Sequence, residues 1–136
     1  MIRYILDTNI CIALIRRRDQ AVRGRLVNCA PGTVALSAVT LAELEFGIQK
    51  SMQTDRNRIA LAAFTAQLKV LPFGANAAAH YGDIRALLQR AGTPIGPLDT
   101  MIAAHARSIG ATVVTDNERE FRRVEGLEVE NWLGVS

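Results

Sequence analysis

Four acidic residues stand where this chain changes from an apolar run to the polar start of another element. Asp7 follows the apolar run 2–6, and Asp116 follows the β-branched run 111–114. Glu43 and Asp99 lie early in two segments whose apolar residues have helical spacing. Two carboxylates about 4 Å apart repel by roughly 4 kcal/mol at an effective dielectric near 20, so a cluster of them needs a cation. Oxygen ligands without histidine or cysteine favour Mg²⁺, or Mn²⁺, over zinc.

A metal held in this way can do a definite kind of chemistry. It can bind a phosphate, activate a bound water as the nucleophile and neutralise charge in the transition state. The four acids are therefore predicted to be catalytic and metal-binding residues of a phosphodiester-cleaving site. Their polar neighbours could hold the carboxylates in place, although turn formation explains the asparagines equally well; these neighbours are Thr8, Asn9, Thr115 and Asn117. Glu118 and Glu120 could add a ligand but are interpreted as solvated.

Each acid also has an ordinary structural explanation. Asp7 and Asp116 could be helix N-caps, a role that stabilises a helix by roughly 1 kcal/mol. Glu43 follows Thr40 by three residues, which is the spacing of a capping box. Asp99 in a first helical turn would be favoured by the helix dipole. The joint arrangement is harder to explain by capping, because all four carboxylates would point to one crevice.

The elements that must position these acids follow from the hydrophobic pattern. Strands are predicted at 2–6, 33–36, 69–73 and 111–114, with a small final strand at 127–129. Helices are predicted at 8–17, 20–28, 37–50, 59–68, 75–91 and 97–110. Strands that alternate with helices indicate an α/β fold with a central parallel sheet of four to five strands, covered on both faces. The carboxyl ends of such strands share one edge, so Asp7 and Asp116 can converge.

Composition limits the class of protein. A chain of 136 residues with 49% apolar content fits a single domain spanning residues 1–136. Its apolar runs are too short to cross a bilayer, and its first residues lack signal-peptide features, so we expect a cytoplasmic protein without membrane contact. Cys11 and Cys29 lack metal-site spacing and are interpreted as buried thiols.

The charge balance favours a polyanionic partner. The net charge is +3, and without the four candidate acids the chain has sixteen basic against nine acidic residues, or +7. Fourteen of the sixteen basic residues are arginine, which binds phosphate in a bidentate fork. For any single arginine, an ordinary solvated helix face is an equally good explanation. His80 and His105 share faces with apolar residues and are predicted to be satisfied structural histidines, and Trp132 is predicted to pack in the core.

Several motifs, in this order and spacing, resemble the PIN-domain ribonuclease toxins of the VapC type. They are Leu6-Asp7-Thr8-Asn9; Thr40-Leu41-Ala42-Glu43-Leu44 with Phe46-Gly47; Pro94-Ile95-Gly96-Pro97-Leu98-Asp99; Val114-Thr115-Asp116-Asn117; and Arg119-Glu120-Phe121. The likeness runs from the first strand to Trp132. It implies a three-layer α/β/α PIN-like domain.

The resemblance also implies a function. A member of this group is a Mg²⁺-dependent endoribonuclease, the toxin of a type II toxin–antitoxin pair that inhibits translation by cleaving RNA. Asp7, Glu43, Asp99 and Asp116 match its acidic quartet. Implied partners are a second copy of the chain, as a homodimer, and a small VapB-type antitoxin that blocks the active-site groove. The loop that ends in Asp99 is similar to that of enteric toxins that cut initiator tRNA in its anticodon stem-loop.

Two functions of other classes fit part of the pattern. A phosphoryl-accepting signalling module also gathers acids at strand ends, but it needs a nearby lysine, and Lys50 and Lys69 are poorly placed. A non-catalytic RNA-binding protein would need only the arginines. A DNA nuclease with the same metal chemistry is a further alternative, since that chemistry does not require a 2′-hydroxyl.

Overall fold

The fold is built on a five-stranded sheet in which every strand pair is parallel. The computed structural model describes residues 1–17 and 19–133; Arg18 and the last three residues of the predicted domain, 134–136, lie outside the described residues. The strand order is β3-β2-β1-β4-β5. The strands are β1 (Tyr4–Leu6), β2 (Val34–Ser37), β3 (Lys69–Leu71), β4 (Thr112–Val114) and β5 (Val129–Glu130). The prediction of a parallel sheet with four to five strands is confirmed.

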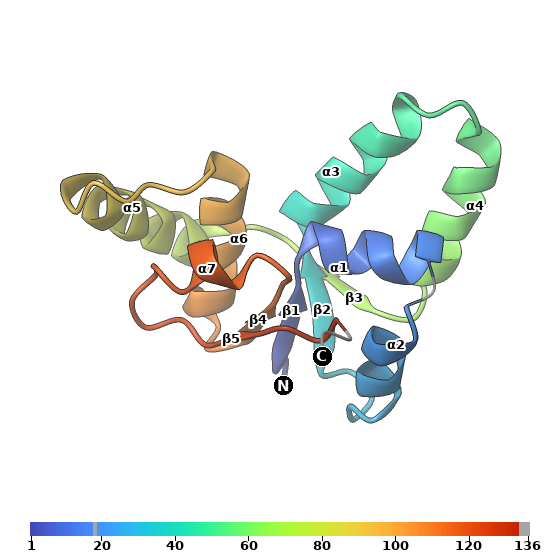
Figure 1. Ribbon diagram of the computed structural model, residues 1–136, viewed down its shortest axis with the longest axis horizontal. Coiled ribbons are helices and arrows are strands. Elements are labelled where there is room, and N and C mark those ends of the chain that lie inside the picture. The colour runs from blue at the N-terminus through green and yellow to red at the C-terminus, as the bar shows by residue number, and fades with distance from the viewer. Residues whose placement is uncertain (18, 134–136) are drawn as a thin grey trace.

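Helices cover both faces of this sheet (Figure 1). One face carries α1 (Thr8–Ile12), a π-helical turn η1 (Ala13–Arg17), α2 (Gln20–Val27), α3 (Ala38–Gln49) and α4 (Thr54–Thr65). The other face carries α5 (Ala75–Arg90), α6 (Pro97–Ser108) and the short α7 (Glu118–Phe121). The three layers are therefore α/β/α, as expected. Within the described part of the chain, no helix is both long and apolar enough to cross a membrane.

Two hydrophobic cores hold the layers together, one on each side of the sheet. Successive residues of a strand point to opposite faces, so Ile5 packs toward α5 and α6 while Leu6 packs toward α1 to α4. In β4, Val113 packs in the same core as Ile5, and Val114 packs in the same core as Leu6. Burial on both faces explains why the strands are continuous apolar runs without polar alternation.

Several predicted boundaries are wrong. Helix α4 begins at Thr54 and not at Ile59, because its first turn is polar and exposed and so lacks the apolar spacing that was used to find it. Helix α7 was not predicted, since it has four residues and only Phe121 is buried. Strand β5 is displaced to Val129–Glu130. The end of the predicted helix 8–17 is the π-helical turn η1.

Both histidines are structural, as predicted. The ring of His105 is buried, with Nδ1 2.7 Å from the hydroxyl of Ser37, and burial lowers the pKa of the imidazole. His80 accepts a hydrogen bond from Arg107 at 2.9 Å. The prediction of two buried thiols is confirmed for Cys11, which is fully buried. It is wrong for Cys29, which is half-buried and donates a hydrogen bond to the carbonyl of Arg25.

Candidate active site

Asp7 lies at the centre of the candidate site. It follows β1, whose last residue pairs with the last residue of β4, so Thr115 leaves the sheet beside it. The Asp7 side chain is only 4% exposed and accepts two hydrogen bonds, from the backbone N–H of Thr8 at 2.7 Å and from the hydroxyl of Thr115 at 2.7 Å. Asp7 is thus also the N-cap of α1, so the capping role and the candidate catalytic role coexist in one residue.

Glu43 reaches the same edge from the second turn of α3. Its Oε1 accepts a hydrogen bond of 2.6 Å from the hydroxyl of Thr8. The capping-box alternative is wrong, because the N-cap of α3 is Ser37, whose hydroxyl accepts from the N–H of Val39. Thr40 is instead a buried residue of the helix. Since capping does not explain Glu43, its contact with Thr8 ties it to the candidate site.

Asp116 lies at the outer side of this edge. It is exposed, and its Oδ1 accepts a 3.4 Å hydrogen bond from the side chain of Asn9. It does not cap α7, where Asn117 is the N-cap and makes no side-chain cap bond. The backbone N–H of Asn117 instead donates to the hydroxyl of Thr115. The four polar neighbours named from the sequence therefore all lie at this edge, and three of them donate to a candidate acid.

Asp99 approaches from the opposite helical layer. It lies in the first turn of α6, a helix that has Gly96 as its N-cap and begins at Pro97. Its pKa is raised to about 6, first by burial and then by the negative charges of Asp7, Glu120 and Glu43. The pKa of Asp7 is also raised, chiefly by burial, with the charges of Asp116 and Glu43 adding to the effect. Negative charge thus accumulates at one edge of the sheet.

Glu120 was interpreted from the sequence as a solvated residue, but the structure places it partly inside the protein. It is half-buried, accepts a 2.8 Å hydrogen bond from the side chain of Asn117 and contributes to the raised pKa of Asp99. Glu118 points elsewhere and pairs with Arg122 at 3.0 Å. The sequence signal for Glu120 was its position four residues after Asp116, but the helix that contains it, α7, was too short to predict.

The donor set fits a hard divalent cation. Among residues 1–17 and 19–133, no three His, Cys, Asp or Glu side chains are placed to share one ion as they stand. The carboxylates do, however, collect at one edge, and the pKa of Asp99 is raised by burial and, to a smaller extent, by repulsion from the neighbouring carboxylates. A cation bound by oxygen ligands relieves that repulsion. The residues available to hold it are Asp7, Glu43, Asp99 and Asp116, with Glu120 beside them.

Metal affinity should depend on pH in a range set by Asp99. A metal binds the ionised carboxylate, and a pKa of about 6 means that a proton competes up to that pH. We expect the affinity for Mn²⁺ to be constant above about pH 7 and to fall about tenfold per unit below pH 6. Isothermal titration at four pH values measures this. An Asp99→Asn variant should lose most of its affinity and the part of the pH dependence that comes from Asp99, while the raised pKa of Asp7 leaves a remainder. A wild-type affinity that stays flat down to pH 4.5 would contradict the prediction.

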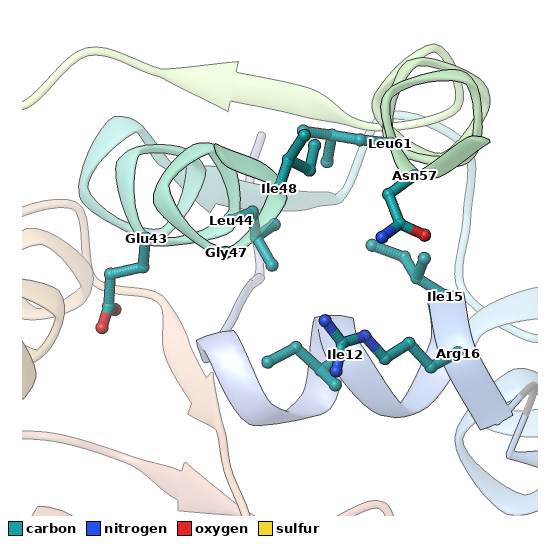
Figure 2. Close-up of a pocket in the computed structure, with 9 residues that line it drawn as sticks. All are labelled: Ile12, Ile15, Arg16, Glu43, Leu44, Gly47, Ile48, Asn57 and Leu61. Carbon is teal, nitrogen blue, oxygen red and sulfur yellow. The ribbon is translucent and has the colours of Figure 1, made fainter. Parts of the chain in front are cut away.

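A large open groove adjoins the acids. It has a volume of about 870 Å³ and lies between the α1–η1 segment, α3 and the start of α6. Thr8, Asn9 and Glu43 belong both to the acidic edge and to the groove wall. A smaller pocket between the α1–η1 segment, α3 and α4 shares Ile12, Arg16, Glu43 and Gly47 with it (Figure 2). A polymer lying in the groove would therefore pass next to the carboxylates.

Comparison with known families defines the class of protein. Residues 4–127 match the family model of the PIN domain. That range contains strands β1 to β4 and all four candidate acids, and it ends two residues before β5. The chain therefore belongs to the PIN-domain family, whose ribonucleases generally depend on a divalent metal.

Sequence relatives narrow the class further. The chain is 48% identical over 132 residues to the tRNA(fMet)-specific endonuclease VapC of Shigella flexneri, covering 97% of this chain and 99% of that one. It is 44% identical, with the same coverage, to the tRNA(fMet)-specific endonuclease VapC of Salmonella typhimurium. Within the PIN-domain family, the chain is a nuclease of the VapC type. This result favours the enzyme over the two non-catalytic alternatives.

Solved structures agree with the sequence relatives. The VapC-type fold in DNA-bound VapBC from Salmonella typhimurium superposes with a TM-score of 0.93 at 44% identity, over 97% of this chain and 99% of that one. VapBC2 from Rickettsia felis, bound to a DNA fragment from its promoter, gives a TM-score of 0.92 at 38% identity with the same coverage. The expected α/β/α PIN fold is confirmed.

Proposed function

We propose that this chain is a Mg²⁺-dependent endoribonuclease and the toxin of a VapBC-type toxin–antitoxin pair, with initiator tRNA as its substrate. Asp7, Glu43, Asp99 and Asp116 are the proposed catalytic and metal-binding residues. The single observation that carries the proposal is the gathering of these acids at one sheet edge, with the pKa of Asp99 raised to about 6 by burial and by neighbouring negative charge. Mn²⁺ is a second candidate ion, since it takes the same ligands.

The roles of the residues follow from their placement. When bound, a divalent ion would supply an activated water and charge neutralisation at the scissile phosphate. Asp7 is fixed by hydrogen bonds from Thr8 and Thr115, so its carboxylate is oriented before any ligand arrives. Thr8 also fixes Glu43 by donating to it. Asn9 and Asn117 are proposed to hold Asp116 and Glu120 in the same way.

The substrate and the partners rest on the relatives. Two relatives with nearly complete coverage are named for tRNA(fMet), and two superposed structures are VapBC complexes. We therefore propose that the chain cleaves initiator tRNA in the anticodon stem-loop and thereby stops translation. A small VapB-type antitoxin would silence it by covering the acidic edge. We further propose a homodimer acting in the cytoplasm, where tRNA is found, with residues 1–136 as one nuclease domain.

Cleavage of bacterial total RNA tests this proposal. The purified chain is incubated with RNA in Mg²⁺ or in excess EDTA, and new 5′ ends are mapped by sequencing. We expect discrete cuts in initiator tRNA that depend on Mg²⁺ and disappear in the Asp7→Asn variant. The matched control is Asp55→Asn, an exposed acid in the first turn of α4, which should cut normally.

Three outcomes would count against it. Cuts that survive EDTA would exclude the metal-dependent mechanism. Metal-dependent cuts only in other RNAs would keep the nuclease but overturn the proposed substrate. Equal cleavage of a matched DNA strand would favour the DNA nuclease alternative.

A further inference from the structure

Helix α3 and its C-cap residue carry a row of three side chains that leads away from the acidic edge. Glu43, Phe46 and Lys50 are spaced by three and four residues, so they lie on one face of the helix. At about 1.5 Å per residue the row extends roughly 10 Å along the groove wall. All three residues line the groove of about 870 Å³. The row therefore connects a candidate catalytic residue to an aromatic ring and then to a cation.

Phe46 is unusual because a large aromatic side chain is left in water beside a catalytic edge. Its side chain is 66% exposed, and the ammonium of Lys50 lies 5.1 Å from the centroid of its ring. Leu98 and Met101 of α6 line the same groove and extend its apolar surface. Together these side chains form an exposed apolar surface inside a groove, which is typical of a ligand-binding site.

A second cation lies on the opposite wall. Arg16 comes from the π-helical turn η1 and lines both the groove and the small pocket between η1 and α3 (Figure 2). π-Helical turns occur frequently at functional sites. Within residues 1–17 and 19–133, neither Arg16 nor Lys50 forms an ion pair. Both charges are thus available to an anionic ligand.

We propose that this groove binds the RNA strand next to the cleaved bond, with an unpaired base stacked on Phe46 and flanking phosphates paired with Arg16 and Lys50. An aromatic platform flanked by cations is how proteins hold single-stranded nucleic acid, because every base has a π-face and every linkage carries a charge. An apolar peptide would not need the two cations. The inference rests on the proposed function, and it makes Phe46 a positioning residue that acts on substrate binding.

Cleavage kinetics with initiator tRNA test the role of Phe46. The Phe46→Ala variant should raise KM about tenfold and change kcat less than threefold, since base stacking contributes to binding and not to the chemical step. Phe46→Tyr should restore KM. The matched control is Ile59→Ala, which removes another exposed apolar side chain, 71% exposed, on α4. An unchanged KM in Phe46→Ala, with active wild-type protein, would overturn the proposal.

Salt-dependent binding tests the two cations without relying on cleavage. Fluorescently labelled initiator tRNA is titrated with protein in the Asp99→Asn background, so that the RNA stays intact. Arg16→Gln and Lys50→Gln should each reduce the slope of log affinity against log salt concentration by about 0.7, the value for one phosphate contact in a single strand. Arg90→Gln, at the exposed end of α5, should leave the slope unchanged.

These measurements separate the competing explanations. If wild-type protein does not cut RNA but Phe46→Ala still weakens binding of the labelled tRNA, the proposed function fails, and of the groove proposal only the contact between Phe46 and RNA stands. If Phe46→Ala instead halves the molar mass seen by light scattering, the groove is an interface between two copies of the chain, and the proposal is overturned.

Discussion

Replacing Asp99 with asparagine is expected to lower the rate of RNA cleavage by about a thousandfold or more. The substitution keeps the size of the side chain but removes one of the charges that would hold a divalent ion, and metal assistance contributes several kcal/mol to such a reaction. The measurement is single-turnover cleavage of initiator tRNA in saturating Mg²⁺. Cleavage within tenfold of wild type would remove Asp99 from the proposed catalytic residues.

The same variant should be more stable than wild type in the absence of metal. Because the pKa of Asp99 is raised to about 6, the folded chain binds more protons than the unfolded chain, and the stability contributed by the protonated carboxyl is lost as pH rises from about 4 through 6. Asparagine cannot ionise and so avoids this loss. We expect a gain on the order of 1 kcal/mol at pH 7.5, or about 3 °C in Tm, after allowance for solvent screening.

Thermal unfolding in EDTA at pH 4.5 and pH 7.5 checks this expectation. The difference in Tm between Asp99→Asn and wild type should be large at pH 7.5 and small at pH 4.5. Added Mg²⁺ should stabilise wild type more than the variant. A variant that is less stable than wild type at pH 7.5 would mean that Asp99 supports the fold, and its loss of activity could then not be assigned to the metal site.

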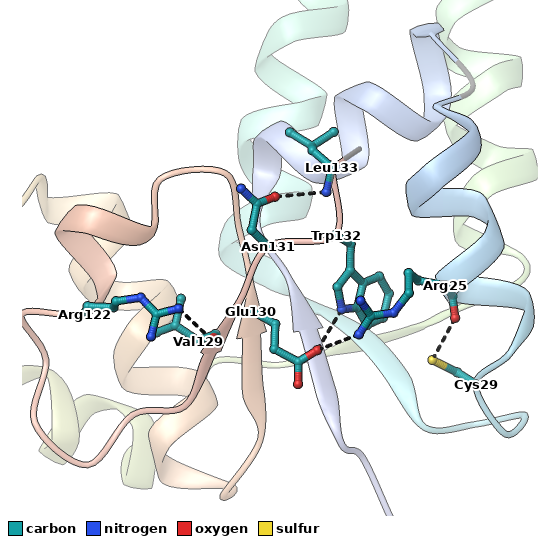
Figure 3. A network of polar contacts seen from close by, with 8 residues as sticks. All are labelled: Arg25, Cys29, Arg122, Val129, Glu130, Asn131, Trp132 and Leu133. Atoms are coloured by element: carbon teal, nitrogen blue, oxygen red, sulfur yellow. Dashed lines mark hydrogen bonds and ion pairs between the residues drawn. The ribbon is translucent and has the colours of Figure 1, made fainter. Parts of the chain in front are cut away.

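Replacing Trp132 with alanine is expected to lower the free energy of unfolding more than any other substitution proposed for this chain. The indole is 2% exposed, its ring lies 5.0 Å from that of Tyr4, and the guanidinium of Arg25 lies 5.2 Å from its centroid. Its Nε1 donates to Glu130 at 2.9 Å, and Arg25 donates to the same carboxylate oxygen (Figure 3). These contacts attach the segment after β5 to β1 and α2. We expect a loss of about 3–5 kcal/mol, measured by urea unfolding.

A conservative variant separates packing from hydrogen bonding. Trp132→Phe keeps an aromatic ring in the core but loses the bond to Glu130, so its cost should be near 1–2 kcal/mol. Stacking on a base of the RNA is the other role that an aromatic ring at this position could have. A Trp132→Ala chain with unchanged unfolding free energy but weaker binding of initiator tRNA would favour that alternative over the core role.

The sequence by itself determined the architecture and singled out the four candidate acids. Apolar runs such as 111–114 and helical spacing in 75–91 predict alternating strands and helices, because burial on both sheet faces selects continuous apolar strands. The end of α5 follows from a similarly local signal, because Gly92, two residues after its last residue Arg90, has a φ of +72° that glycine adopts without strain. Short elements such as α7 were missed because four residues carry no periodicity.

Only the tertiary structure decided what each acid contacts. Asp7 is held by Thr115, 108 residues away in the chain, and Glu43 is held by Thr8, 35 residues away. Strand pairing and helix packing create these contacts, and no local pattern encodes them. The same long-range packing places Glu120 near Asp99, and it leaves Phe46 exposed in a groove where helical spacing alone would not distinguish it from a core residue.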